Sequence, residues 1–226
     1  MEVELLHQPD SAIARIQLDA GEEIIAEAGS MIAMSDALQV NTTMRQGRRG
    51  GGIMGGLKRM IAGESLFLSQ FRSYQDGNEI WLAPKLIGDL LVYDMEGQDL
   101  IVQATSYLAC SSKVDLDLGF EGIKSVFSGE SIFWLTLSGY GKAILTSFGG
   151  IYAIPVDGEY TVDTGHIVAF ERTLDFNVTK ASSSWIGSFL GGEGLVCRFR
   201  GQGKVYCQTH SVSAFGSIIG SLLPAR

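Results

Sequence analysis

The feature that most restricts the fold of this chain is a short sequence pattern that occurs three times. Each copy places a glycine and a glutamate directly before a run of residues typical of β-strands. The copies lie at residues 62–71, 128–137 and 191–199. Apolar residues spaced as on one face of a short helix precede each copy. One repeat of this size has too little core to fold alone, so we expect the three to pack together.

A second repeated element precedes the first in each copy and predicts a strand with one buried face. Its copies span residues 29–43, 105–118 and 165–179. Each ends in alternating apolar and polar residues, as in Val114, Asp115 and Leu116. Such alternation places the apolar side chains on one face of a strand. Glycines at 77–78 and 201–203 predict hairpin turns between the last two strands of a unit.

The repeat predicts an all-β fold with short helices, built from three small β-rich units in one compact domain. The units cover residues 1–76, 77–140 and 141–210. The chain has 29 glycines and only 4 prolines, which suits frequent tight turns between short strands. We expect a ring with pseudo-threefold symmetry, because each unit would then cover strand edges of its neighbours. A linear stack of the units is also compatible with the sequence.

Two segments, together with the three-unit organisation, resemble one protein family over nearly the whole chain. They are AEAGSMIAMSD at 26–36 and the more specific RRGGGIMGGLKRMIAGESLF at 48–67. The chain is thereby similar to the altered-inheritance-of-mitochondria family, largely uncharacterised bacterial proteins with a fungal mitochondrial branch. The resemblance implies a triplicated β-sandwich related to the tryptophan RNA-binding attenuation protein, and a non-enzymatic role. Fungal relatives imply an organising role at a membrane, which we do not transfer because the N-terminal residues show no targeting presequence.

Composition and charge argue against several classes of protein. The net charge of −8 and the pI near 4.9 argue against nucleic acid as a partner. The first residues are mixed and acidic, and no apolar stretch approaches the roughly 18 residues of a membrane span. The three cysteines, Cys110, Cys197 and Cys207, are expected to be reduced core thiols of a cytoplasmic protein.

The strongest local departure from this acidic composition is the glycine-rich segment at residues 44–60. It has no acidic residue and carries five positive charges, on Arg45, Arg48, Arg49, Lys58 and Arg59. A segment of this kind is commonly a solvated loop. It is also our candidate binding surface for an anionic membrane, a nucleic acid or an acidic protein. Because it offers no aromatic residue for base stacking, a membrane is favoured over RNA.

Residues 213–223 predict a short amphipathic helix at the C-terminus. Serines and glycines occupy one face, and the apolar positions on the other are Phe215, Ile218, Ile219, Leu222 and Leu223. A tail of this kind most often covers an open end of a β core or packs on a neighbouring subunit. Membrane docking is the alternative, which the lack of basic residues on the polar face disfavours.

The repeated glutamates Glu64, Glu130 and Glu193 are the remaining candidate site. If they pointed inward on a threefold axis, the three carboxylates would titrate abnormally or bind a cation. Burying unpaired charge is costly, so we favour a structural role in which each caps backbone amides of its own turn. The three histidines lack the spacing of metal ligands, and we predict no metal and no cofactor.

The sequence therefore predicts a non-enzymatic scaffold or interaction protein, because it contains no recognisable catalytic triad or acid–base pair. The alternative is a small-ligand-binding module that uses crevices between repeats or subunits. Strand edges left outside a three-unit ring predict a homo-oligomer, a trimer or a multiple of one. A cytoplasmic location, peripheral to a membrane where the basic segment binds one, completes the prediction.

Overall fold

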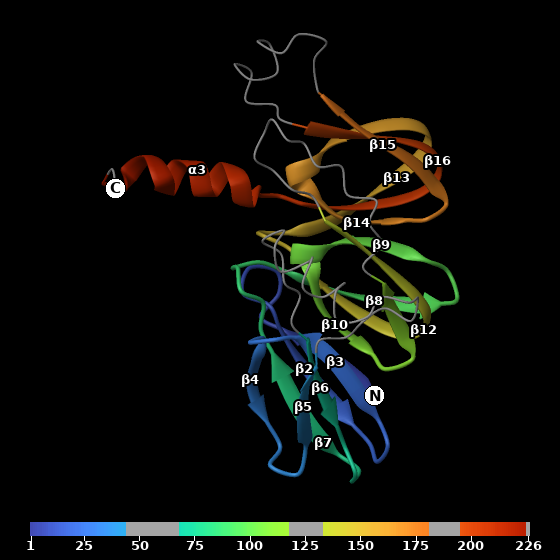
Figure 1. Ribbon diagram of the computed structural model, residues 1–226, viewed down its shortest axis with the longest axis vertical. Helices are drawn as coiled ribbons and strands as arrows, with labels where there is room; N and C mark the ends of the chain where they lie inside the picture. The colour runs from blue at the N-terminus through green and yellow to red at the C-terminus, as the bar shows by residue number, and fades with distance from the viewer. Residues whose placement is uncertain (44–67, 118–132, 181–194, 225–226) are drawn as a thin grey trace.

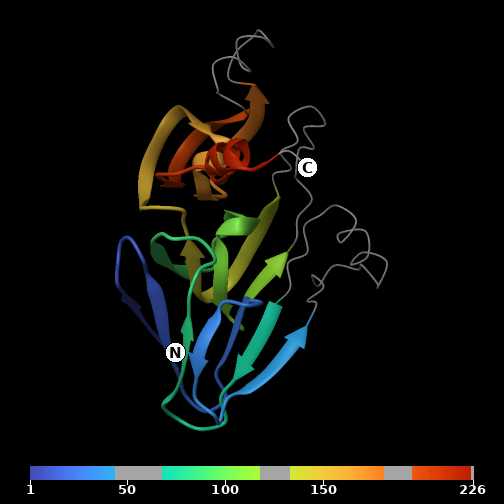
Figure 2. The same cartoon turned by 90° about the vertical axis from the view of Figure 1, so that its left-hand side faces the viewer.

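The computed structural model describes residues 1–43, 68–117, 133–180 and 195–224. Their structure is mostly β-strand, as the sequence predicts, with one α-helix near the C-terminus. The strands stack in three groups along the long axis, with the first strands at one end and the last at the other (Figure 1). Helix α3 (Val212–Leu222) projects sideways from the C-terminal group, and Figure 2 shows it end-on.

The strands of the first group are short and separate. They are β1 (Glu2–Leu6), β2 (Ile13–Leu18), β3 (Glu23–Glu27), β4 (Met31–Met34), β5 (Gln39–Thr43), β6 (Leu68–Arg72) and β7 (Asn78–Leu82). The second group ends in one long strand. It contains β8 (Leu90–Glu96), β9 (Leu100–Gln103), the 3-10 turn Ala104–Ser106, β10 (Tyr107–Ser111), β11 (Val114–Asp117) and β12 (Trp134–Thr146).

The third group has long strands at both its start and its end. It contains β13 (Ile151–Asp163), the 3-10 turn Thr164–His166, β14 (Ile167–Glu171), β15 (Leu174–Lys180) and β16 (Leu195–Gln208). The predicted alternation of buried and exposed residues is clear in β11, where Val114 and Leu116 are buried and Asp115 and Asp117 are exposed. The helical residues predicted before each Gly-Glu pair lie outside the described residues.

Four antiparallel pairings occur in each of the three groups. The first pairing is β2–β7 in the first group, β8–β12 in the second and β13–β16 in the third. In the same order of groups, the second pairing is β3–β6, β9–β12 and again β13–β16, and the third is β4–β7, β10–β12 and β14–β16. The fourth pairing is β5–β6, β11–β12 and β15–β16. A single long strand in the later groups therefore makes the pairings that two short strands make in the first group.

An irregularity of the pairing also recurs at one position. The register shifts by one residue within β4, β10 and β14, so that the pairing skips Ile32, Leu108 and Val168. A skipped residue bends the strand and increases its twist. The three strands thus share a bend as well as a pairing scheme.

The predicted hairpin turns are wrong, because neither glycine segment connects two strands that pair with one another. β6 and β7 lie in different sheets, joined by a turn at Gly77 with φ of +75°. Residues 201–203 lie within the continuous strand β16, where Gly201 has φ of +125°. Glycine tolerates this backbone conformation, which allows one strand to bend and pair in two directions.

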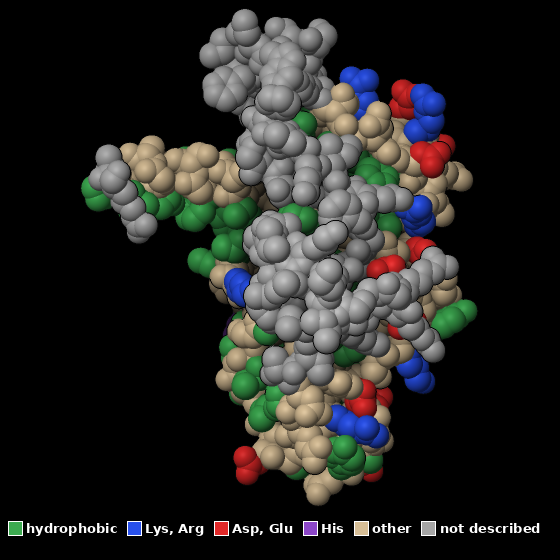
Figure 3. All heavy atoms as spheres, in the orientation of Figure 1, with side chains coloured by type: hydrophobic (Ala, Val, Ile, Leu, Met, Phe, Trp, Pro, Cys, Tyr) green, Lys and Arg blue, Asp and Glu red, His purple; other side chains and the backbone are tan. Residues whose placement is uncertain are grey.

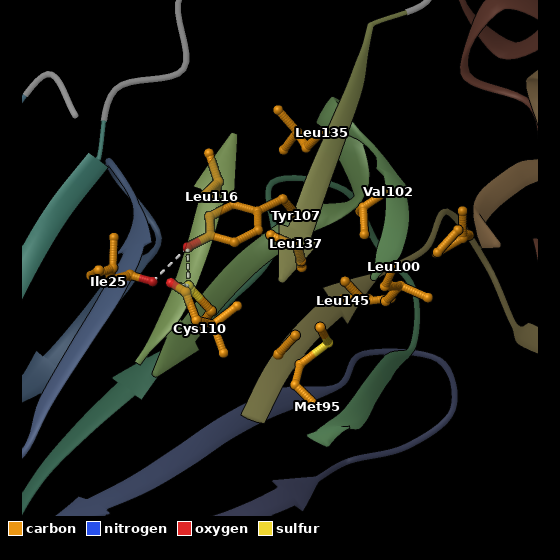
Figure 4. Packing of buried hydrophobic residues seen from close by; sticks show 14 of the residues in the cluster. Ile25, Met95, Leu100, Val102, Tyr107, Cys110, Leu116, Leu135, Leu137 and Leu145 are labelled. Atoms are coloured by element: carbon orange, nitrogen blue, oxygen red, sulfur yellow. Dashed lines mark hydrogen bonds between the residues drawn. The ribbon is translucent and has the colours of Figure 1, made fainter. Parts of the chain in front are cut away.

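Two further pairings join the groups to one another. β10 pairs with β3 of the first group, and β14 pairs with β9 of the second. At the first of these junctions Tyr107 is completely buried, and its hydroxyl donates a hydrogen bond of 2.8 Å to the carbonyl oxygen of Ile25 (Figure 4). The same hydroxyl lies 3.3 Å from the sulfur of Cys110. One cluster of buried hydrophobic residues contains members of all three groups, among them Ile25, Tyr107 and Val168.

Candidate interaction surface

Helix α3 is the predicted C-terminal helix, and the structure bears out its position. Ser211 precedes it in extended conformation and accepts a hydrogen bond from the amide of Ala214 at 3.4 Å. A serine at this position satisfies one of the amides that have no partner within the helix. The helix begins one residue earlier than predicted, at Val212, and ends at Leu222.

The apolar face of α3 is exposed rather than packed on the β-strands. No residue of the helix is buried, and the side chains on its apolar face are between 42% and 77% exposed. They are Val212, Phe215, Ile218, Ile219 and Leu222. Apolar side chains gather along one side of the projecting helix in Figure 3, the lower side in that view. A soluble helix normally buries such a stripe, so this face is suited to bind something outside the described residues.

The polar face of α3 carries no charge, and two of its three serines bond within the helix. The hydroxyl of Ser217 donates to the carbonyl oxygen of Ser213 at 2.9 Å, and that of Ser221 donates to the carbonyl of Ile218 at 2.7 Å. A hydroxyl with an internal acceptor loses less free energy when it leaves water. The helix can therefore enter a partly apolar environment at low cost.

The start of α3 is held firmly against the C-terminal group of strands. The Phe215 ring packs edge-on against the Phe148 ring, with centroids 5.3 Å apart, and Phe148 also contacts His210. Gln208 is only 4% exposed and accepts a bond from the Phe148 amide while donating to the carbonyl of Gly165, both at 2.9 Å. This anchoring fixes the direction in which the helix leaves the body.

The other predicted site residues cannot be placed. The basic residues Arg45, Arg48, Arg49, Lys58 and Arg59 and the glutamates Glu64, Glu130 and Glu193 all lie outside the described residues. Strand pairing makes Phe71, Leu137 and Phe199 equivalent, since they face equivalent residues of β5, β11 and β15. The first two follow their glutamate by seven residues and Phe199 follows Glu193 by six, so the third glutamate is offset from the other two in the sequence.

The described cysteines are poor nucleophiles. All three are buried thiols, and Cys197 and Cys207 lie near opposite ends of β16 instead of facing each other. Burial raises the pKa of the Cys197 thiol to about 12 and that of Cys207 to about 11. A thiol is reactive only when ionised, so these side chains remain inert near neutral pH.

The described histidine, cysteine and acidic residues form no group of three or more that could hold a metal ion. Nδ1 of His166 lies 2.9 Å from the carbonyl oxygen of Gln208, so this histidine supports the segment that leads into α3. Within the described part of the chain, no helix is long and apolar enough to cross a membrane. Among the described residues, the exposed apolar face of α3 is thus our candidate interaction site.

Comparison with known proteins assigns the chain to a family. A family model described as mitochondrial biogenesis AIM24 matches residues 3–210. The chain belongs to the AIM24 family. One relative is an uncharacterised protein of Streptococcus pyogenes serotype M6. It is 29% identical over 217 residues, which cover 94% of this chain and 87% of the relative. The AIM24 resemblance drawn from residues 26–36 and 48–67 is thus confirmed.

A solved structure shares the fold of this AIM24 protein. The X-ray crystal structure of a Streptococcus pyogenes protein superposes with a TM-score of 0.81 at 25% sequence identity, covering 98% of this chain and 99% of the other. The AIM24 match ends at residue 210, before α3 begins at Val212. The family match therefore does not include α3.

Sequence reasoning missed a second exposed apolar feature, strand β4. All four of its residues are exposed, although its sequence, Met31-Ile32-Ala33-Met34, is as apolar as that of a core strand. Its equivalents β10 and β14 are buried over their first four residues. In the sequence, only the place of β4 in the first repeat distinguishes it from β10 and β14.

Proposed function

We propose that this protein is a non-enzymatic scaffold that docks on an anionic membrane surface through helix α3 and the basic segment 44–60. The observation that carries the proposal is the rigidly anchored helix that holds an apolar, uncharged stripe away from the body. A cytoplasmic location, peripheral to the membrane, belongs to the same proposal. A protein partner for the same helix is the competing occupant, and the experiment below separates the two.

The energetics favour two membrane contacts acting together. α3 is about 16 Å long, and each of its large apolar side chains contributes about 1.5–3 kcal/mol when fully buried. A helix lying in the interface buries only part of each side chain, so one short helix binds weakly. Each Lys or Arg near an anionic surface adds about 1 kcal/mol, and α3 has none. The five basic residues of segment 44–60 would supply that attraction.

Co-sedimentation with vesicles tests this proposal. The full chain is expected to bind phosphatidylserine-containing vesicles and to bind pure phosphatidylcholine vesicles at least about tenfold more weakly. Replacing Ile218 and Ile219 by Ser should lower binding to both kinds of vesicle. Replacing Arg48, Arg49, Lys58 and Arg59 by Ser should remove only the preference for anionic lipid.

Replacement of Ser213 by Ala on the polar face of α3 is the matched control and should bind as the wild type does. The proposal fails if the isoleucine and the basic variants sediment with anionic vesicles as well as the wild type. Loss of a protein partner in the isoleucine variant, with vesicle binding unchanged, would assign α3 to that partner instead.

We further propose that the β-rich body is a triplication of one unit with a fold like that of the tryptophan RNA-binding attenuation protein. The four recurring pairings and the shared bend at Ile32, Leu108 and Val168 support three related units. The units follow one another along the stack and use the same type of junction twice, so they do not close into the ring with pseudo-threefold symmetry that the sequence led us to expect. In such a scaffold, features that differ between units are the ones available for binding, as α3 and segment 44–60 are.

A further inference from the structure

Strands β4, β10 and β14 occupy the same place in the pairing scheme but differ in burial. β10 and β14 are buried over their first four residues because each lies between two strands. Each pairs on one side with the last strand of its own group and on the other with a strand of the preceding group. Among the strands that the structure describes, β4 pairs with β7 alone, and Ile32 is 54% exposed.

The strands that cover β10 and β14 have an equivalent in the third group, and no strand of the described chain pairs with its outer edge. β3 and β9 have this role in the first and second groups, and residues 158–163 of β13 have it in the third. Among the described strands, β13 pairs with β16 alone, so its other edge is unoccupied. Its residues 157–161 are exposed, among them Tyr160 at 46%.

Other unoccupied edges in the described strands follow a different pattern: β8 and residues 151–157 of β13 each have a free edge, whereas their equivalent β2 pairs with β1. The outer edges of β5, β11 and β15 are unpaired in all three groups, so their exposure belongs to the unit itself. Only the edges of β4 and of β13 at residues 158–163 are unpaired at the ends of the stack and paired inside it. These two edges are the two halves of the contact that the chain already makes twice.

We propose that β4 of one molecule pairs antiparallel with residues 158–163 of β13 in a second copy of this chain. The occupant is a second copy because the internal junctions already join these two strand types. The register of the internal junctions predicts the register between two molecules. Ala109 faces Ala26 and Cys110 faces Ile25 at the first junction, and Ala169 faces Val102 at the second. At the intermolecular junction Ala33 would then face Val162, and Met34 would face Thr161.

The position of the two edges makes the association head to tail. β4 lies toward one end of the long axis and β13 toward the other (Figure 1), so the two edges of one molecule do not meet. Because the contact joins two different surfaces, each added molecule leaves one β4 edge and one β13 edge free at the ends of the assembly. Such a contact closes into a ring when the rotation permits and otherwise continues as a filament. Continuous β-pairing across the contact is the same device by which proteins extend a sheet with a foreign strand.

Complementation between two blocked variants tests the proposal. The first carries Ile32→Lys and Met34→Lys, and the second carries Tyr160→Lys and Thr161→Lys, all at exposed positions. Lysine on an edge strand opposes pairing, since the charge would be buried in the contact. Each variant alone should associate at least about 100-fold more weakly than the wild type in sedimentation velocity. An equimolar mixture should form a 1:1 dimer, because each molecule retains the edge that the other lacks.

Three results would overturn the proposal. One is a wild type that stays at its monomer mass of 24.3 kDa up to millimolar concentration. Another is a blocked variant that still associates alone, which would indicate a contact between identical surfaces. The third is a mixture that stays monomeric although circular dichroism shows both variants folded.

A cysteine pair tests the register independently of any blocked variant. Molecules with Met34→Cys mixed with molecules with Thr161→Cys should form a disulfide-linked dimer on mild oxidation, since directly opposed residues lie within disulfide reach. Met34→Cys mixed with Glu159→Cys is the matched control, displaced by two residues on the same face of β13. It should give at least about tenfold less dimer. Equal yields from both mixtures would refute the register.

Discussion

The two junctions between the groups of strands have the same backbone pairing and different side-chain chemistry. At the β3–β10 junction, the buried hydroxyl of Tyr107 bonds to the carbonyl of Ile25 in the neighbouring group. Beside the β9–β14 junction, the Phe170 ring packs against Trp134, Phe176 and Phe199, with centroids 4.8 to 5.3 Å apart. The backbone pairing is therefore common to both junctions, whereas a buried polar contact stabilises the first and aromatic packing stabilises the second.

The largest expected effect comes from removing an aromatic ring at the second junction. Phe170→Ala should lower the free energy of unfolding by about 3–5 kcal/mol, because a completely buried ring is replaced by a cavity. Urea denaturation followed by tryptophan fluorescence measures the change. Phe176→Ala is the control: this ring is only half-buried and should cost less. Equal losses would mean that burial does not explain the role of Phe170.

A smaller effect is expected from the polar contact at the first junction. Tyr107→Phe keeps the ring and leaves the buried carbonyl of Ile25 without this donor, which should cost about 1–3 kcal/mol. Tyr93→Phe, at a half-buried tyrosine, is the matched control and should change stability by less than about 0.5 kcal/mol. If the two variants unfold at the same urea concentration, the Tyr107 hydroxyl adds nothing to the junction.

The buried thiols should also make the free energy of unfolding depend on pH. Burial raises the pKa of the Cys197 thiol to about 12 and that of the Cys207 thiol to about 11. In the unfolded chain the pKa of a thiol is about 8.5. Above about pH 8.5 the unfolded chain therefore binds fewer protons than the folded chain, and the free energy of unfolding falls as pH rises. Comparing urea midpoints between pH 8 and pH 10 measures this decrease. Cys197→Ala combined with Cys207→Ala should flatten it, and an unchanged slope would contradict the assignment to these thiols.

The sequence predicted the elements whose signal is local. Alternation at residues 114–117 predicted a half-buried strand, and helical spacing at residues 213–223 predicted α3 to within one residue at each end. The family also followed from the sequence, because residues 48–67 carry a specific motif. The hairpins failed because glycines at 77–78 and 201–203 indicate a bend without indicating which strands will pair.

Exposure was the property that the sequence could not predict. Met31–Met34 has the composition of a buried strand, and only its place at the end of a series of junctions leaves it uncovered. Likewise, the apolar stripe of α3 was expected to cover a β core, to pack on a neighbouring subunit or to dock on a membrane, and within the described chain it is not buried on the β-strands. In both cases the missing information is three-dimensional: the local pattern is the same whether or not a neighbour is present.

The junction strands also have a consequence for how the molecule unfolds. β10 takes part of its hydrogen bonding from β3, and β14 from β9, so each group loses backbone partners when its neighbour opens. Because neighbouring groups share backbone hydrogen bonds, states in which only one group has opened have a higher free energy than the intact chain or the fully unfolded chain. Although its architecture is modular, the protein should melt in a single cooperative transition, as one domain does.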